Sequence, residues 1–583
     1  MKKTSHLVYL LLFMLVLPKT GISQTRQRQE NQVLVRTISG ALLYLEDRQL
    51  RLRKKEVGNF HPRTRDKNFY LMSGQWHPAS KLVDDRKTAV WRSWIAFLPK
   101  RFRWGSHAFM LAPDDNLFLL LSTAYPLYLF TEQEDAAGYL LAMKNKIQNR
   151  TALYKRGQAY NFWPKMPGVY GNTTRTGPPF IPVRFIHRLT SFCLNPRHDS
   201  FCEWLTYGQD VVPKTWFQTI RSPQNTTGED AFFNIPNDAD DTSLAVALQQ
   251  LWYDRIKTKS PPGTDEPDID ALKYLGRFRD TARMKEDGRD AWKGTETNAY
   301  LTWLKQEQSS LFGNPESGIM PMGVNNVDAV INANVLFVLG LTGIHDERGE
   351  KVAIHLLERA VSKHPWSKTA LYYPQDLALS YAVTRAYRDG GVRNLSMQRV
   401  VSKVLVGLLE MQYRYSDKHP QKSGGFPGGD DHSTVLGTAL ALSSLLNIGE
   451  NIAIKEGLLS EYRQAIVGAV HYLTHHKKVC RIRYADSFNS IQKRDLGFSS
   501  RKAFYWKAGL AFSSSYSDLA HWRSRAYTVA MVLEGLTKYL LEYDKHDFGI
   551  QNGPRVLILS YPMDARRHPM TFEIQPQNRK REF

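Results

Sequence analysis

The sequence predicts an all-α fold, an (α/α)6 toroid of six inner and six outer helices with an irregular cap insertion at one mouth. Three observations predict it. Several strongly apolar helical runs begin alike, with an acidic or polar residue followed by small and aliphatic residues. Amphipathic runs alternate with them, and loops rich in Gly and Pro separate the two kinds. Helices that are apolar all round are buried, whereas amphipathic helices cover a core, so the alternation indicates two concentric layers.

The inner helices are expected to follow six anchor segments, spaced by roughly 50 residues or about twice that where a loop is inserted. The segments are 113–119, 238–248, 325–336, 374–382, 429–440 and 522–530. In the last segment, Trp522-Arg523-Ser524-Arg525, arginine replaces the acid. Because the inner helices of such a ring run in the same direction, their N-termini meet at one end. The acids expected to line one funnel there are Asp115, Asp240, Asp328, Asp376 and Asp431.

The outer layer is expected from amphipathic runs at Lys351–Lys363, Met397–Tyr415 and Leu458–His475. The longest insertion, 154–230, is rich in Pro, Gly and aromatic residues and is interpreted as the cap. It contains Cys193 and Cys202, which are close enough in sequence to form a disulfide in an oxidising compartment, with Cys480 left over.

The 583 residues divide into four expected parts. Residues 1–23 resemble a signal peptide, with Lys2 and Lys3 before a short apolar stretch and Gly21-Ile22-Ser23 at the cleavage positions. Residues 24–100 form a helical or irregular extension, 101–545 the toroid, and 546–583 a basic tail. The mature protein is therefore expected to be extracytoplasmic, periplasmic or secreted.

The formal net charge is +22, or 22 − 3 = +19 once Lys2, Lys3 and Lys19 leave with the signal peptide. A basic exported protein is expected to make peripheral contact with anionic envelope surfaces. The basic residues are spread along the chain and match no nucleic-acid-binding motif, so no nucleic-acid partner is expected.

The segment Asp238-Ala239-Asp240-Asp241-Thr242 opens an apolar helical run and is the sharpest candidate site. One Asp is a good helix cap, but three carboxylates exceed what a cap needs. Crowded carboxylates cannot all ionise cheaply in a dry site, so one of them is expected to keep its proton at neutral pH.

This segment resembles the D-x-D-D-T motif of class II terpene cyclases. Gly424-Gly425-Phe426, followed by Ser433-Thr434 and Thr438-Ala439-Leu440, is similar to a repeat of the squalene cyclase and protein prenyltransferase superfamily, whose members are α/α toroids. The looser resemblance covers about residues 100 to 545. The Q-x-x-x-G-x-W repeats, the D-x-C zinc pattern and the D-D-x-x-D metal motif are absent from the sequence, and the signal peptide departs from the usual cytoplasmic setting of these cyclases.

The resemblance implies an isomerase or cyclase in which Asp240 protonates an alkene, while Asp238 and Asp241 hold the proton and its geometry. Aromatic faces would then stabilise the carbocation. The substrate-binding candidates are Trp163, Phe232, Phe233, Asp328, Tyr372, Phe426 and Asp431. No cofactor or metal is expected, since Asp430-Asp431-His432 is interpreted as a helix start.

Two alternatives remain open. Many extracytoplasmic polysaccharide-active enzymes, both glycosidases and lyases, use an (α/α)6 toroid, and a third class of toroid binds a ligand or partner without catalysis. A cyclase requires a closed apolar chamber with Asp240 buried, whereas a glycosidase requires an open cleft with two carboxylates about 5 to 10 Å apart. The ligand in the funnel is thus either apolar or a glycan. The sequence predicts no oligomeric state.

Overall fold

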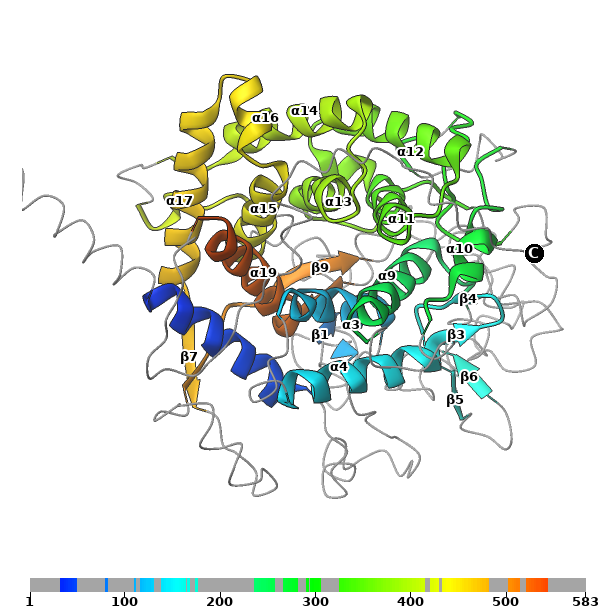
Figure 1. The fold of residues 1–583 in the computed structure, drawn as a ribbon, viewed down its shortest axis with the longest axis horizontal. Coiled ribbons are helices and arrows are strands. Elements are labelled where there is room, and N and C mark those ends of the chain that lie inside the picture. Colours follow the sequence, from blue (N-terminus) through cyan, green and yellow to red (C-terminus); the bar gives the residue numbers. More distant parts are fainter. Residues whose placement is uncertain are drawn as a thin grey trace, which may run out of the picture.

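The computed structural model describes the parts of the chain that form the helical body. These are residues 32–49, 116–130, 138–163, 235–256, 266–281, 290–292, 294–305, 325–414, 420–428, 433–481, 502–513 and 521–543, with short strands at 79–81, 110–111, 165–167 and 174–176. Helices account for about two thirds of these residues (Figure 1), so the fold is helix-rich, consistent with the all-α prediction.

Six buried helices pack side by side in the middle of the body (Figure 1). Each contacts the next one in chain order, and the last contacts the first. Each helix begins inside its predicted anchor segment, at most five residues after the first residue of that segment. This confirms the six helix predictions. They are α3 (Leu117–Ala124), α9 (Ala239–Ile256), α11 (Ala329–Thr342), α13 (Asp376–Arg388), α15 (Thr434–Ile448) and α19 (Arg525–Tyr543).

Further helices lie outside this set and cover it. α4 packs on α3, α10 on α9, α12 on α11, and both α14 and α17 on α15. Their apolar residues face inward: α12 buries Ala353, Ile354 and Leu357, as its amphipathic pattern predicts. These helices are α4 (Gly138–Thr151), α10 (Ile269–Leu275), α12 (Glu347–Ala360), α14 (Leu395–Met411), α16 (Glu450–Lys455) and α17 (Leu459–His475). Residues 32–48 form one more helix, inside the predicted N-terminal extension.

Short strands occur that the sequence analysis did not predict. One antiparallel sheet has the order β2 (Met110–Leu111), β1 (Ala79–Lys81), β10 (His521–Ser524) and β9 (Gly509–Ser513). Three two-stranded sheets pair β3 (Lys155–Arg156) with β4 (Ala159–Tyr160), β5 (Lys165–Pro167) with β6 (Thr174–Thr176), and β7 (Lys478–Arg481) with β8 (Lys502–Tyr505). The described residues also include the 3-10 helices η2 (Tyr125–Leu129), η3 (Ala152–Tyr154), η7 (Trp366–Thr369) and η8 (Pro420–Lys422).

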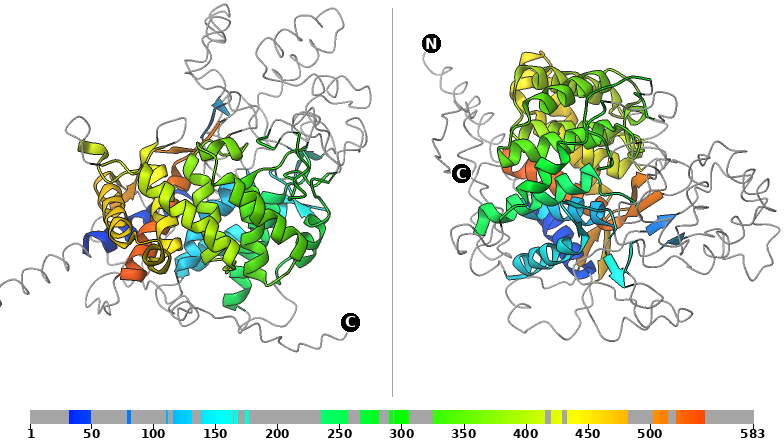
Figure 2. Two further views of the ribbon diagram at one scale, coloured as in Figure 1. Left: turned by 90° about the horizontal axis from the view of Figure 1, so that it is seen from above. Right: turned by 90° about the vertical axis from the view of Figure 1, so that its right-hand side faces the viewer.

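The four-stranded sheet lies at one end of the buried helices (Figure 2). β10 leads directly into α19, where the Ser524 hydroxyl accepts a hydrogen bond from the Tyr527 amide at 3.1 Å and so caps the helix. The sheet is therefore at the N-terminal end of α19. This placement brings β9 to the end of the body where the acidic segment also lies.

Close backbone approach depends on glycine at two places among the buried helices. A Cβ on Gly340 of α11 would lie 2.0 Å from the Gly390 carbonyl oxygen, and one on Gly437 of α15 would lie 2.0 Å from the Pro427 carbonyl oxygen. Neither contact tolerates a side chain, so glycine sets how closely α11 and α15 approach the neighbouring loops. No helix in the described part of the chain combines the length and apolarity needed to cross a membrane.

Candidate active site

The acidic segment forms the first turn of α9. Asp238 caps the helix, because its Oδ1 accepts a hydrogen bond from the Asp241 amide at 2.7 Å. The backbone is anchored on both sides: the Asp238 amide donates to the Tyr160 carbonyl at 3.2 Å, and the Ala239 amide donates to the Thr302 carbonyl at 2.8 Å. All three carboxyl groups are buried, with 1 to 6% of each residue exposed. The cap accounts for only one of them.

Asp238 and Asp241 form a hydrogen-bonded carboxyl pair. Burial raises the pKa of Asp238 to about 7, and its hydrogen bonds with Asp241 oppose that shift. Burial, followed by the charge of Asp238, raises the pKa of Asp241 well above its ordinary range. Two adjacent carboxyls cannot both ionise cheaply in a buried site. Burial therefore favours one proton on this pair, held mainly by Asp241.

Asp240 contacts α11 and the segment before α13. Its Oδ1 accepts a hydrogen bond from Asn334 Nδ2 at 2.5 Å, and its Oδ2 accepts one from the Tyr373 hydroxyl. Burial raises the pKa of Asp240, while the hydrogen bonds from Tyr373 and Asn334 and the charge of Arg385 oppose the shift. Desolvation thus favours the protonated acid, and the fixed donors stabilise the carboxylate once the proton has left. This combination suits a general acid.

Arg385 of α13 holds the side-chain amide of Asn334, which in turn orients Asp240. Its Nη2 donates to Asn334 Oδ1 at 2.6 Å, so the amide nitrogen of Asn334 must face Asp240. The guanidinium lies over the ring of Phe337 at 4.6 Å and is 3% exposed. A planar cation stacked on an aromatic face and bonded at its edge is held in one orientation. Arg385 is therefore a positioning residue for Asp240.

Aromatic side chains gather beside Asp240 around Phe512 of β9. Tyr373 joins the acid to this cluster, because its hydroxyl bonds Asp240 and its ring meets that of Phe512 edge-on at 6.0 Å. Tyr372 stacks on Phe512 at 5.9 Å with the two rings nearly parallel. The other rings around Phe512 are Phe118 at 5.7 Å, Phe162 at 5.4 Å and Trp522 at 4.9 Å. Aromatic faces of this kind stabilise positive charge.

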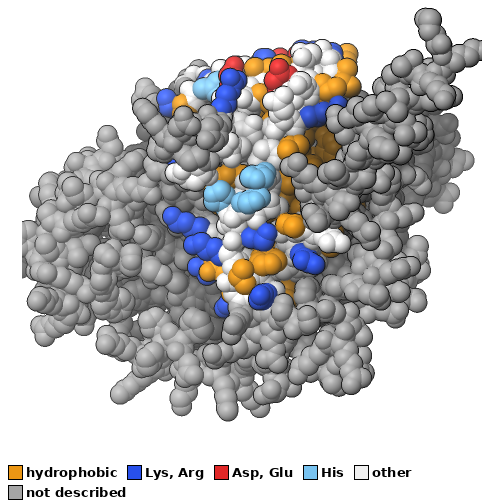
Figure 3. Space-filling view, turned by 90° about the vertical axis from the view of Figure 1, so that its left-hand side faces the viewer, with side chains coloured by type: hydrophobic (Ala, Val, Ile, Leu, Met, Phe, Trp, Pro, Cys, Tyr) orange, Lys and Arg blue, Asp and Glu red, His pale blue; other side chains and the backbone are white. Residues whose placement is uncertain are grey.

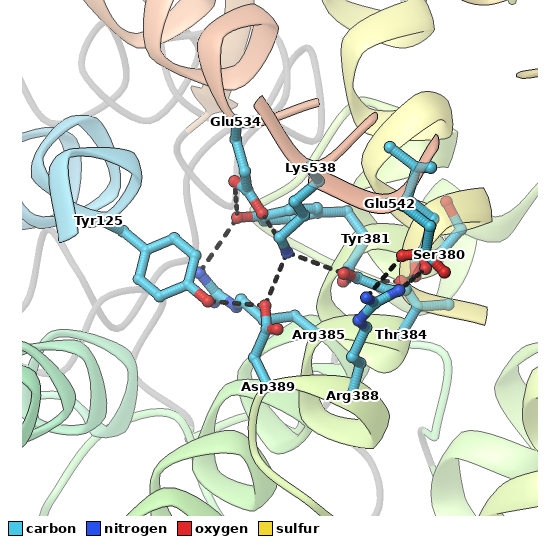
Figure 4. A network of polar contacts seen from close by, with 12 residues as sticks. Tyr125, Ser380, Tyr381, Thr384, Arg385, Arg388, Asp389, Glu534, Lys538 and Glu542 are labelled. Atoms are coloured by element: carbon cyan, nitrogen blue, oxygen red, sulfur yellow. Dashed lines mark hydrogen bonds and ion pairs between the residues drawn. The ribbon is translucent and has the colours of Figure 1, made fainter. Parts of the chain in front are cut away.

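A buried ionic network lies toward the C-terminal ends of the same helices (Figure 4). Lys538 Nζ donates to Glu534 Oε1 at 2.8 Å, to Asp389 Oδ2 at 2.7 Å and to Asn447 Oδ1 at 2.7 Å. Glu534 Oε2 accepts from the Tyr381 hydroxyl at 2.7 Å, which in turn accepts from Arg385 Nη1 at 3.4 Å. Through Arg385, a continuous chain of hydrogen bonds links Lys538 to the Asp240 site.

Three of the other predicted site residues are buried around this centre. Asp328 is the N-cap of α11: its Oδ1 accepts from the amides of Val330 and Ile331 at 2.8 and 3.2 Å, and its Oδ2 accepts from the Tyr372 amide at 3.1 Å. Tyr372 belongs to the aromatic cluster. Trp163 packs edge-on against Phe162 at 4.5 Å and thus borders the same cluster.

Phe426 is fully buried, and its amide donates to Thr438 Oγ1 at 2.9 Å at the start of α15. This makes it part of the core that fixes α15. Six predicted residues lie outside the described part of the chain, namely Asp115, Cys193, Cys202, Phe232, Phe233 and Asp431. Cys480 is a free cysteine. Among the described residues, no group of three or more His, Cys, Asp or Glu is placed to hold a metal ion.

The sequence analysis missed the residues that orient Asp240 and those of the ionic network. Asn334 and Tyr373 have no sequence signal of their own, since their role depends on the meeting of three helices. The ionic network did have a sequence signal. Glu534 and Lys538 are four residues apart inside an apolar helix, and Arg385 and Asp389 have the same spacing near the end of α13. Charges at this spacing on a buried helix indicate an internal ion pair. No protein-family model and no curated protein matches this chain, so its own geometry is the basis for assigning a function.

Proposed function

We propose that the chain is a proton-initiated isomerase or cyclase that acts on an apolar, alkene-containing isoprenoid, with Asp240 as general acid. The setting of Asp240 carries this proposal: a buried carboxyl group with a raised pKa, hydrogen-bonded by Asn334 and Tyr373 and adjacent to aromatic rings. Protonating an alkene requires an acid whose conjugate base is stabilised in advance. The carbocation that results requires aromatic faces rather than nucleophiles around it.

The scaffold in this proposal is the (α/α)6 toroid. The cyclic packing of the six buried helices supports it, as does the second layer of amphipathic helices. Contacts also place the start of α9 beside Tyr373, which precedes α13, and the start of α11 beside Tyr372. The N-termini of these three helices therefore meet at one end, as a ring of parallel inner helices requires.

In the proposed reaction the Asp240 proton passes to one alkene carbon. The π electrons form the new C–H bond, and the neighbouring carbon becomes cationic. Asp240 is left as a carboxylate, which the donors Asn334 and Tyr373 and the charge of Arg385 stabilise. Attack by a second alkene of the same molecule forms a ring bond and moves the cationic centre to another carbon. Loss of a proton from a carbon next to the final cation then quenches it, and the proton passes to solvent, which also reprotonates Asp240. The proton given up at that step balances the one consumed, so substrate and product are isomers.

The polar edges of the aromatic cluster favour an apolar substrate over a glycan. Trp303 Nε1 and Asn326 Nδ2 both donate to the Tyr372 hydroxyl, at 3.1 and 2.9 Å. The Tyr373 hydroxyl bonds Asp240. These polar atoms are committed within the protein, whereas a sugar needs such atoms for its own hydroxyl groups. The hydroxyl groups of both tyrosines are thus already occupied within the protein.

The test is the conversion of isoprenoid alkenes of several chain lengths in D2O. Wild-type protein is expected to place one solvent deuterium in each product molecule. Asp240→Asn is expected to lower the rate by ~10²–10⁴-fold, the usual contribution of a general acid. Asp376→Asn is the matched control, because Asp376 also starts a buried helix but accepts a hydrogen bond from the Ser367 amide.

Full activity of Asp240→Asn, or products without deuterium, would refute the mechanism. Release of reducing ends from polysaccharides by the same preparations would instead establish the glycan-active alternative. If neither substrate class reacts but one binds, the non-catalytic alternative holds.

The proposal also places the protein outside the cytoplasm, in peripheral contact with an anionic surface. Supporting it, His and Lys or Arg side chains gather on the face where α17 ends (Figure 3). In the last turns of α17 and around strands β7 and β8, the exposed residues include His471, His475, Lys478, Lys502 and Lys507. Sedimentation with vesicles is expected to increase with their anionic lipid content and to fall at high salt. Equal sedimentation with neutral vesicles would contradict this contact.

A further inference from the structure

Tyr527 lies in the first turn of α19 and adjoins the proposed active site. Its amide bonds the Ser524 hydroxyl at 3.1 Å, which fixes this turn where β10 ends. The residue is 5% exposed, and the centroid of its ring lies 6.3 Å from that of Phe118. Phe118 in turn contacts Phe512 at 5.7 Å and Tyr373 at 5.5 Å. Tyr527 is therefore part of the aromatic cluster described above.

Charged groups of three buried helices act on the Tyr527 hydroxyl. Burial raises its pKa most; the charge of Arg385 opposes this shift, and the carboxylates of Glu534 and Asp240 add to it. Because these groups come from α13, α19 and α9, the hydroxyl lies in the interior where the buried helices meet. The phenol keeps its proton at neutral pH, so it remains able to donate a hydrogen bond.

The Tyr527 hydroxyl has no hydrogen-bond partner among the described residues. The other tyrosine hydroxyls around this centre are occupied. Tyr373, Tyr381 and Tyr125 each donate to a carboxyl group. Tyr372 accepts from an indole and from an amide nitrogen. Buried donors are almost always bonded, so the Tyr527 hydroxyl requires an acceptor that the described part of the protein does not supply.

We propose that Tyr527 determines substrate specificity, because its hydroxyl donates a hydrogen bond to an oxygen atom of the isoprenoid. The substrate is then a terpenoid alcohol, ether or carbonyl compound rather than a hydrocarbon. One donor beside an aromatic cluster fits one oxygen on an otherwise apolar skeleton. The inference rests on the proposed function, since it concerns the ligand of the same site. A water molecule is the competing acceptor, and the test separates the two.

The test measures dissociation constants, by tryptophan fluorescence, for three ligands that share one skeleton. They are farnesol, its methyl ether, which only accepts hydrogen bonds, and the hydrocarbon β-farnesene. Tyr527→Phe is expected to weaken the binding of farnesol and of the ether by about tenfold, because their oxygen is then buried without a donor. The binding of β-farnesene is expected to stay unchanged. Comparing each ligand between wild type and variant cancels the differences in hydration among the ligands.

Tyr462→Phe is the matched control. Tyr462 is a buried tyrosine of α17 whose hydroxyl donates to the Leu445 carbonyl at 3.1 Å. This variant is expected to bind all three ligands like wild type and to unfold at a lower urea concentration, since it loses an internal hydrogen bond. Tyr527→Phe is expected to keep the wild-type unfolding midpoint.

Each other outcome overturns the inference or a named part of it. Unchanged farnesol binding by Tyr527→Phe would leave water as the acceptor, and equal losses for all three ligands would refute the hydrogen bond. A loss for farnesol but not for its ether would refute the donor role. A lowered unfolding midpoint for Tyr527→Phe would place the acceptor within the protein. If wild type bound none of the ligands, the inference and the proposed substrate class would both fail. The expected binding pattern without turnover would overturn the isomerase chemistry alone.

Discussion

Replacing Lys538 by methionine tests the energetic role of the ionic network. The ammonium is 4% exposed and bonds three acceptors, namely Glu534, Asp389 and Asn447, at 2.7 to 2.8 Å. Methionine has nearly the same length and no charge, so the variant removes the cation without leaving a large cavity. Two carboxylates then remain buried without their shared counter-charge.

The expected loss follows from the unpaired charges. Removing one partner of a buried ion pair costs about 3–5 kcal/mol, because the other charge stays buried without compensation. Lys538 serves two carboxylates, so the upper part of that range is expected. A buried carboxylate that has lost its counter-charge favours its uncharged, protonated form. A raised carboxyl pKa in the folded state stabilises the fold at low pH, so the penalty should shrink as the pH falls.

Urea unfolding at pH 7 and pH 5, with unchanged m-values, measures both effects. The double variant Glu534→Gln/Lys538→Met is expected to recover part of the loss, because one of the two orphaned charges is gone. Lys273→Met is the control: Lys273 pairs with Asp270 in the open, with both side chains more than half exposed, and its loss should cost less than about 1 kcal/mol. A penalty for Lys538→Met below about 1 kcal/mol, or one independent of pH, would refute the reasoning.

Three further changes have defined outcomes. Burial raises the pKa of Asp328 to about 7 from 3.8, so the contribution of this carboxyl to stability is present below pH 4 and is lost as the pH rises through 7. Between these pH values, the free energy of unfolding of wild type should fall by roughly 4 kcal/mol relative to that of Asp328→Asn, as measured by urea unfolding. Asn334→Leu removes a donor from the Asp240 carboxylate and should lower the rate of the proposed isomerisation by ~10²–10³-fold without changing substrate affinity, measured as separate kcat and KM. Gly437→Ala forces a Cβ against the Pro427 carbonyl and should cost about 1–3 kcal/mol, measured by thermal unfolding.

The helices were predictable because burial of a whole helix and burial of one face produce different local patterns. α11 is apolar over three turns, and α12 alternates faces, so each pattern could be interpreted from neighbouring residues alone. The strands could not be predicted in this way. β1 and β10 have at most four residues each, and they pair with one another across more than 400 residues of sequence. Nothing local distinguishes such a strand from a loop.

Of the candidate site, only the acidic segment itself could be predicted from the sequence. Three acids within four residues indicate an unusual helix start, and all three are buried in the structure. Which one faces the aromatic cluster depends on residues from other helices, Asn334 and Tyr373, and that information is not in the spacing of the motif. Asp328 was predicted from its position at a helix start, and its carboxylate accepts hydrogen bonds from the amides of Val330, Ile331 and Tyr372, contacts that depend on the fold and have no local sequence signal.

The charges along the hydrogen-bonded chain bear on where the proton of the site resides. The chain links three acids, Asp240, Glu534 and Asp389, with two bases, Arg385 and Lys538. With every group ionised its sum would be −1, which is costly in a dry interior, and one bound proton restores neutrality. Glu534 and Asp389 each contact the Lys538 ammonium directly, whereas Asp240 contacts only neutral donors and reaches Arg385 through Asn334. The proton is therefore cheapest to place on Asp240, the one acid of the chain that adjoins the aromatic cluster. The ionic network would thereby support the proposed general acid from a distance, because its fixed charges leave Asp240 as the acid of this chain that holds the proton.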